Sequence, residues 1–217
     1  MNEARQTVYL IDDDEDLRRS LVRLLDCAGV PCAPHASAAE FLTQVETLGP
    51  GCLLLDLRMP GMDGLELQAE LIRREIHLPI VFLTANGDVP ASVKAMKGGA
   101  VDFLTKPVQP PQLLAAIESA LALEREMRGR RADIKRTRAL LERLTPREWE
   151  VLMLVVQGLL NKQIGAELGA AEKTIKIHRA HVMEKMEATS LAGLVSMVER
   201  VGGVEELRRL RPLGVNP

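Results

Sequence analysis

The sequence predicts an α/β fold, a five-stranded doubly wound parallel sheet, followed by a second, all-α domain of four helices. In the first half of the chain, β-rich runs alternate with apolar residues at helical spacing, as in parallel sheets covered on both faces. In the second half only the helical spacing continues. The charge divides similarly: residues 1–122 hold 10 Lys/Arg and 17 Asp/Glu, and residues 123–217 hold 18 and 13. The basic half could meet a polyanion, although so small an excess does not identify one.

The first strand is expected at Thr7–Ile11, a β-rich run that ends on a cluster of acidic residues. The central strand is expected at 52–57, because its bulky apolar residues are typical of a strand buried on both faces, and it ends before a Pro-Gly turn. The other strands are expected at 30–33, 79–84 and 101–105, and the helices between the strands at 17–28, 36–48, 65–76 and 90–97.

The helical pattern that restarts after Pro111 runs unusually far, to about Leu144. We interpret residues 123–142 as a helical linker that follows a first domain at 1–122. Apolar residues recur every seven positions, but the partner heptad position holds Arg130 and Thr137, so a stable coiled coil is not expected. The linker is therefore expected to be mostly solvated, and contact with a second copy stays open.

The segment Thr145-Pro146-Arg147-Glu148 predicts a helix start, because it supplies an N-cap, a proline at the first helical position and a glutamate three residues after the cap. Four helices are expected, at 146–157, 161–168, 172–186 and 190–201, within a second domain at 143–204. Trp149 is expected to be partly buried in this domain or to contact the first. The tail, 205–217, is expected to be frayed, with at most a turn of helix at 205–210.

The chain shows neither a signal peptide nor a run of about 20 apolar residues, so a cytoplasmic protein that does not bind membranes is expected. Its three cysteines, Cys27, Cys32 and Cys52, are odd in number and lack metal-ligand spacing. We expect them to be ordinary buried thiols in a reducing compartment.

Three aspartates are expected to meet at one edge of the sheet. Asp12 and Asp13 end the first strand and Asp56 ends the third, and these strands are neighbours if the strand order is 2-1-3-4-5. An all-oxygen set of converging carboxylates suits Mg²⁺. The alternative is that the acidic run only caps the next helix and complements its dipole, which fits Asp14 to Asp16 better than the first two aspartates.

A hydroxyl and an ammonium are expected at the same edge, from Thr84 after the fourth strand and Lys106 after the fifth. A metal, a cation and a hydroxyl are what the oxygens of a transferring phosphoryl group need, and Asp56 would supply the nucleophile for an acyl phosphate. Alternatively, Lys106 is a surface lysine and Thr84 a β-former. The neighbouring carboxylates favour phosphoryl transfer.

This chain resembles the receiver domain of two-component response regulators in four segments, which occur in the same order: Leu10–Asp14, Leu55–Gly64, Leu83–Ala85 and Gly99–Pro107. The resemblance implies a flavodoxin-like fold and phosphorylation of Asp56 by a sensor histidine kinase. It implies that Mg²⁺ is held by Asp13, Asp56 and the backbone carbonyl of Arg58, and by Asp12 through water. It also implies that Lys106 pairs with the phosphoryl group, Thr84 hydrogen-bonds it and Phe103 rotates inward as a switch, and that the Lys106–Pro107 peptide is cis.

A short helix and a longer helix, joined by a turn at Gly169, predict a helix-turn-helix. At about 100° per residue, Ile175, Val182 and Met186 share one face, which is expected to be the core stripe. The opposite face carries Lys173, Lys176 and Ile177. An apolar side chain between lysines suits a major groove, where it can meet a thymine methyl while the lysines reach guanine edges or phosphates. The alternative is a solvated face with one stray isoleucine.

Together with Leu144–Glu148, this stretch is similar to the LuxR-type helix-turn-helix, and its pairing with a receiver resembles the FixJ/NarL group of transcription regulators. The resemblance implies that Lys176 and Ile177 face bases, and that residues near phosphates are Asn161, Lys162, Thr174, His178 and Arg179. Leu160 and Ala171 stand where a serine usually caps a helix. Each missing cap is expected to cost about 1 kcal/mol, unless Asn161 replaces the first.

The expected function is phosphorylation-dependent transcription regulation by a protein that is not an enzyme. Its expected partners are a sensor histidine kinase, a double-stranded DNA operator and, when phosphorylated, a second copy of the chain. The rival is a Mg²⁺-dependent phosphohydrolase that turns over an aspartyl phosphate. Such enzymes commonly have a second carboxylate two residues after the nucleophile, where this chain has Arg58. A regulator that acts through protein contacts alone is disfavoured by the lysines of the recognition helix.

Overall fold

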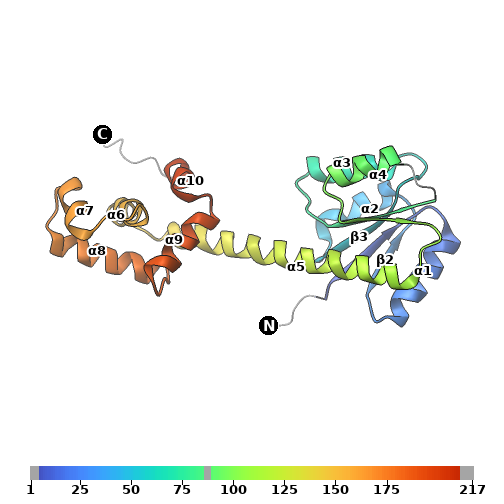
Figure 1. Ribbon diagram of the computed structural model, residues 1–217, viewed down its shortest axis with the longest axis horizontal. Helices are drawn as coiled ribbons and strands as arrows, with labels where there is room; N and C mark the ends of the chain where they lie inside the picture. Colours follow the sequence, from blue (N-terminus) through green and yellow to red (C-terminus); the bar gives the residue numbers. More distant parts are fainter. Residues whose placement is uncertain (1–4, 86–88, 211–217) are drawn as a thin grey trace. The chain divides into compact units, whose positions relative to one another are not determined.

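A computed structural model describes residues 5–85 and 89–210, which fall into two compact units, 1–127 and 128–217 (Figure 1). The first unit contains a parallel sheet of order β2-β1-β3-β4-β5, as predicted. Its strands are β1 Thr7–Ile11, β2 Cys32–His35, β3 Gly51–Asp56, β4 Ile80–Thr84 and β5 Asp102–Thr105. Ile11 pairs with Leu55, so β1 and β3 end side by side at the carboxyl edge. The acidic residues that follow these strands therefore come together there.

Helices cover both faces of this sheet, and each face has its own apolar core. The helices are α1 Glu15–Cys27, α2 Ala38–Gln44, α3 Gly64–Arg73, α4 Val89–Lys97 and α5 Pro110–Leu141. Figure 1 shows α1 and α5 on one face and α2, α3 and α4 on the other, which agrees with the residues of the two cores. The structure shortens two predicted helices. The helix expected at 36–48 is α2, which ends at Gln44 and is followed by a 3-10 turn, η1 Val45–Thr47. α3 ends at Arg73 rather than Ile76, because Glu75 adopts a left-handed backbone with φ of 58°.

The second unit consists of helices only within the described residues. They are α6 Pro146–Val156, α7 Asn161–Glu167, α8 Glu172–Lys185, α9 Leu191–Arg200 and α10 Gly203–Leu210. The predicted capping box is present at the start of α6, where Thr145 and Glu148 each accept a hydrogen bond from the other's backbone N–H. Trp149 is 4% exposed and belongs to the core of this unit, so the expected packing role is confirmed.

The two ends of this unit differ from expectation in part. Residues 203–210 form a helix, α10, which is longer and better packed than the expected turn, because Leu207 is fully buried in the core against α6 and α9. The rest of the tail lies outside the described residues. The linker, 123–142, is mostly solvated, as expected, and belongs to one continuous helix, α5, but its last turns are an exception. Thr137, Leu140 and Leu141 are buried there, because the apolar stripe that resembled half of a coiled-coil seam faces the core of its own unit.

The cysteines also differ from expectation, since only Cys52 is buried. Cys27, the last residue of α1, is exposed, and Cys32 is half-buried. Burial raises the pKa of Cys32 to about 11 and that of Cys52 to about 12, so both remain protonated thiols at neutral pH. Among the described residues, no helix is both long and apolar enough to cross a membrane.

Candidate functional site

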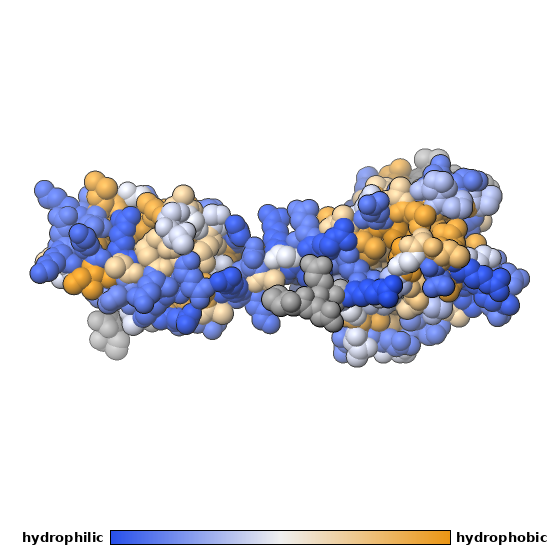
Figure 2. All heavy atoms as spheres, turned by 90° about the horizontal axis from the view of Figure 1, so that it is seen from below, coloured by the Kyte–Doolittle hydropathy of each residue, from blue (hydrophilic) through white to orange (hydrophobic). Residues whose placement is uncertain are grey.

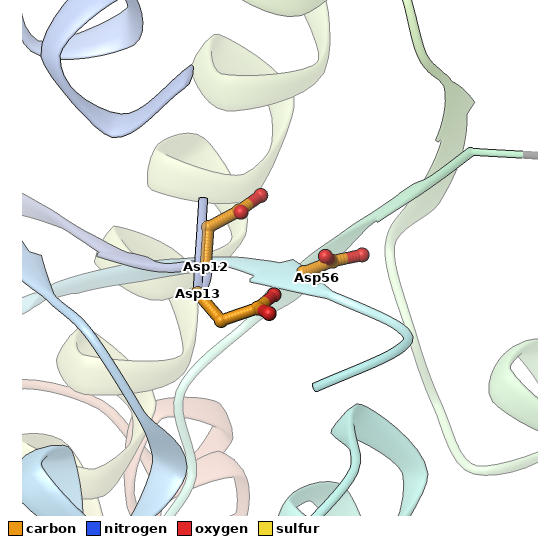
Figure 3. A group of neighbouring side chains, drawn as sticks. All are labelled: Asp12, Asp13 and Asp56. Atoms are coloured by element: carbon orange, nitrogen blue, oxygen red, sulfur yellow. The ribbon is translucent and has the colours of Figure 1, made fainter. Parts of the chain in front are cut away.

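Three carboxylates from two neighbouring strands meet at the carboxyl edge of the sheet (Figure 3). Asp12 and Asp13 follow β1 and Asp56 ends β3, and one oxygen of each lies within 4.8 Å of the others. Asp12 is fully buried, Asp56 is 6% exposed and Asp13 is exposed. Figure 3 shows the carboxylates of Asp12 and Asp13 opening toward the side on which Asp56 lies. The predicted convergence is therefore present.

Lys106, after β5, reaches this cluster with its ammonium. Its Nζ donates to Asp12 Oδ2 at 2.7 Å and to Asp56 Oδ2 at 2.8 Å. Burial acts to lower the pKa of Lys106, but the hydrogen bonds and charges of both aspartates outweigh it, so the pKa is raised and the ammonium stays charged. For Asp12, burial raises the pKa, and the hydrogen bonds from Lys106 and the Asp14 backbone only partly offset it.

Thr84 ends β4 beside this cluster and is 2% exposed. Its carbonyl accepts a hydrogen bond from the Lys106 N–H, so the two residues are joined across the sheet edge. The Lys106–Pro107 peptide is cis, as the resemblance implied. Phe103 lies in β5, is half-buried, and its ring centroid is 6.3 Å from that of Phe82. The backbone N–H of Arg58 donates to Asp56 Oδ1 at 3.3 Å.

The donor set of this cluster fits a magnesium ion. Its ligands are carboxylate oxygens only, and Mg²⁺ prefers oxygen ligands and keeps several waters. Asp13 is exposed and so leaves room for a hydrated ion. Among the described residues, the three carboxylates pair directly with one ammonium, that of Lys106, and the Arg18 guanidinium lies close by. An excess of negative charge therefore remains for a divalent cation to balance.

The second unit contains the predicted helix-turn-helix, formed by α7 and α8. Ile175, Val182 and Met186 are fully buried, which confirms the predicted core stripe of α8. The turn between the helices is tight: a Cβ on Gly165 would lie 2.7 Å from the Ala170 carbonyl oxygen. Arg147 also donates to the Leu168 carbonyl at 2.6 Å, a contact that no local pattern had predicted. The backbone of the turn is thus held from α6.

The outward face of α8 is polar with one apolar position, as predicted. Ile177 is 49% exposed, and Lys173, Thr174 and Lys176 are exposed, as is Lys162 on α7. Figure 2 shows hydrophilic residues over most of the visible surface of this unit, with small apolar patches between them. Two of the residues predicted to lie near phosphates also contact each other, because Arg179 Nη1 donates to Asn161 Oδ1 at 3.2 Å. His178 is half-buried.

As expected, side-chain caps are absent from the starts of α7 and α8, where neither N-cap residue makes a side-chain hydrogen bond. Asn161 does not replace the first cap, because its Oδ1 accepts from Arg179. Gln163 Oε1 instead accepts from the Leu160 N–H at 2.8 Å, which satisfies one orphan donor of α7.

Sequence reasoning overlooked Arg18, whose Nη1 donates to the backbone carbonyl of Asp12 at 2.6 Å. A signal was available. A cation near the N-terminus of a helix opposes the helix dipole, so a basic residue one turn after the acidic start of α1 is out of place unless its side chain has another partner.

Comparisons with known proteins give a family match for each of the two units. Residues 8–118 match the family described as response regulator receiver domain, and residues 142–198 match bacterial regulatory proteins of the luxR family. Nodulation protein W of Bradyrhizobium diazoefficiens is 47% identical over 92% of this chain and 88% of its own length. The transcriptional regulatory protein FixJ of Azorhizobium caulinodans is 42% identical over 90% of this chain and 92% of its own length.

Solved structures give the same result. The low-resolution structure of response regulator StyR has a TM-score of 0.80 and 46% identity, and the match covers 91% of this chain and all of that one. The crystal structure described as FixJ-N has a TM-score of 0.53 and 41% identity, over 55% of this chain and 95% of that one. The likeness therefore extends over both units.

Proposed function

This chain belongs to the response regulators that join a receiver domain to a luxR-family DNA-binding domain, and on that premise we propose that it is a transcription regulator controlled by phosphorylation of Asp56. The observation that carries the proposal is the meeting of Asp12, Asp13, Asp56 and Lys106 at one sheet edge. The same chain exposes a lysine-bearing helix-turn-helix.

Asp56 is the proposed acceptor because its contacts leave it the freest nucleophile of the buried pair. Asp12 uses both oxygens, one for Lys106 and one for the Asp14 N–H at 2.9 Å. In contrast, Asp56 Oδ1 accepts a longer hydrogen bond, from the Arg58 N–H at 3.3 Å. In the proposed step, a carboxylate oxygen of Asp56 attacks the phosphorus of a phosphohistidine on the sensor kinase. The O–P bond of an acyl phosphate forms, the P–N bond breaks, and the imidazole leaves.

The residues that would hold Mg²⁺ are Asp13, Asp56 and the Arg58 carbonyl, with Asp12 through water. When bound, the ion would neutralise charge on the phosphoryl oxygens. Lys106 supplies a second positive charge, since its ammonium already lies 2.8 Å from Asp56 Oδ2. Thr84 would donate its hydroxyl to a phosphoryl oxygen, since it ends the neighbouring strand β4.

Coupling to DNA binding is proposed to run through Thr84 and Phe103. Movement of Thr84 toward the phosphoryl group would vacate space for the half-buried ring of Phe103. That change would alter the surface of α4 and β5, part of which lies outside the residues whose side chains are described. Two receivers would then pair there, and pairing would raise the local concentration of two DNA-binding units over adjacent half-sites.

DNA recognition is proposed to rest on the exposed face of α8. Lys176 and Ile177 would contact bases, and Lys173 would lie on the same face. Phosphates would be contacted by residues of both helices: Asn161, Lys162, Thr174, His178 and Arg179. Phosphate contacts would set affinity and the base contacts would set sequence preference.

The acceptor is tested with acetyl phosphate and MgCl₂, with labelling followed by intact mass. Asp56→Ala should abolish labelling. Asp26→Asn removes an exposed carboxylate of α1 and is the matched control, expected to label as the wild type does. Labelling of Asp56→Ala at the wild-type rate would contradict the assignment.

The DNA model is tested by selecting operators from a random pool with the phosphorylated protein and titrating the variants. Lys176→Ala with Ile177→Ala should relax sequence preference, and Lys162→Ala should reduce the salt slope by about 1. Lys135→Ala, which removes an exposed lysine from α5, should leave sequence preference unchanged. Unaltered operator affinity in the double variant would refute the docking of α8.

Dimerisation is tested by sedimentation of the wild type and Thr84→Ala, each with and without phosphorylation. We expect only the phosphorylated wild type to form dimers. A wild type already dimeric at micromolar concentration without phosphate would favour release of an inhibited DNA-binding unit instead.

A further inference from the structure

Arg18 contacts the backbone at the strand end that carries the acidic cluster. It lies one turn after the N-cap of α1, and its side chain reaches back to the end of β1. There Nη1 donates to the Asp12 carbonyl oxygen at 2.6 Å, which is short for a hydrogen bond and typical of a charged donor. The guanidinium therefore binds the peptide that joins Asp12 to Asp13.

The next residue along the helix shows that this contact is specific. Arg19 is exposed, and its guanidinium pairs with Glu15 at 3.1 Å and Asp16 at 3.3 Å on the helix surface. Such exposed pairs contribute little. Arg18 is half-buried and donates to a peptide oxygen instead. The two arginines have the same charge and adjacent positions, but only Arg18 touches the strand end that carries the acidic cluster.

The Asp12–Asp13 peptide matters because its orientation sets the direction of the Asp13 side chain. The Asp12 side chain is held independently, by Lys106 and by the Asp14 N–H. The backbone N–H of Asp12 donates to the His35 carbonyl at 3.3 Å. Asp13, in contrast, is exposed. A backbone carbonyl fixed by Arg18 limits rotation about the bonds on either side of the peptide, and so limits where the Asp13 carboxylate can point.

We propose that Arg18 is a positioning residue for Mg²⁺ binding: it holds the Asp12–Asp13 peptide so that the Asp13 carboxylate faces Asp56. This inference rests on the proposed function, because it assumes that the acidic cluster binds the ion. The direction in which Mg²⁺ affinity changes distinguishes a positioning role from an effect of charge alone. A nearby positive charge by itself repels Mg²⁺, so loss of the charge alone would tighten binding. Loss of a positioning contact would weaken binding.

The test is calorimetric titration of the full chain with MgCl₂. Arg18→Met removes the charge and the donor but keeps an apolar stem, and we expect its Mg²⁺ Kd to rise about fivefold, the ratio typical of one hydrogen bond. Arg19→Met removes the same charge one residue away, and its Kd should stay at the wild-type value or fall. Arg18→Lys keeps one charged donor on a shorter stem, and its Kd should lie between those of the wild type and Arg18→Met.

Phosphorylation by acetyl phosphate supplies a second readout. Arg18→Met should need about fivefold more Mg²⁺ for half-maximal labelling, in line with the expected Kd, and should label at the wild-type rate once Mg²⁺ saturates. Circular dichroism checks that each variant folds, and if Arg18→Met does not, Arg18→Lys carries the test.

The outcomes separate this inference from the proposed function. A Kd for Arg18→Met equal to or below that of the wild type would overturn the positioning role, and so would an equal rise in Arg19→Met. If Arg18→Met does not fold, an Mg²⁺ Kd for Arg18→Lys equal to that of the wild type would also overturn the positioning role. A wild type that binds Mg²⁺ with the expected dependence on Arg18 but never accepts phosphate would contradict the proposed function alone.

Discussion

Gly64 shows how closely the phosphoacceptor strand is packed against α3. It is the first residue of α3, and its N–H donates to the Leu57 carbonyl at 3.1 Å. A Cβ at this position would lie 2.4 Å from the backbone oxygen of Asp56 and 3.1 Å from the Leu57 Cα. Neither of these neighbours is a flexible side chain. Gly64→Ala must therefore move the end of β3, and Asp56 with it.

The size of the effect follows from this overlap. The methyl group needs roughly 1 Å more space, and overpacking of this kind destabilises by about 1–3 kcal/mol. A displacement of about 1 Å at a reacting group can lower a rate about a hundredfold. Gly61 in the same loop is the matched control, because its φ is 79° and a Cβ added there would meet no atom within 4 Å. Gly61→Ala should cost about 1 kcal/mol of backbone strain without moving Asp56.

The assay compares urea unfolding, followed by circular dichroism, with the rate of labelling by acetyl phosphate at saturating Mg²⁺. Both variants should be less stable than the wild type, but only Gly64→Ala should label tenfold to a hundredfold more slowly, about the loss expected from a small misplacement. Wild-type labelling by Gly64→Ala would refute the reasoning, and equal slowing in both variants would attribute the effect to loop stability.

Three further predictions concern the second unit, where Trp149, the only tryptophan, makes fluorescence a selective probe of unfolding. Burial opposes ionisation of Glu148, but hydrogen bonds from Lys185 and Thr145 outweigh it and lower its pKa from 4.5 to about 2. Glu148→Gln should therefore destabilise the second unit by about 1–2 kcal/mol at pH 7. This difference in stability should be present above pH 4.5 and be lost as the pH falls toward about 2. A difference that does not depend on pH would contradict this reasoning. Glu187→Gly should stabilise by about 0.5–1 kcal/mol in urea, because its φ is 53° and its ion pairs are exposed; destabilisation would show that the pairs dominate. Leu207→Ala should destabilise by about 2–4 kcal/mol, whereas a frayed tail would show no change.

Features that depend on a few neighbouring residues could be predicted from the sequence. The runs at Thr7–Ile11 and 52–57 became strands, because bulky and β-branched side chains suit a sheet buried on both faces. The capping box at Thr145 and Glu148 formed as predicted, because its donors and acceptors are three residues apart. The acidic cluster was also predictable, because parallel neighbouring strands end at the same edge.

The tertiary structure alone decided contacts between elements that lie far apart in sequence. Leu207 is an apolar residue among charged sequence neighbours, so whether it is buried depends on the surface that α6 and α9 present to α10. Glu148 meets Lys185 at 2.6 Å across 37 residues. Arg18 is near its partner in sequence, but its long side chain could equally have remained in solvent, as that of Arg19 does. Local periodicity records which face of a helix is apolar, but the distance between two side chains exists only after the elements have packed.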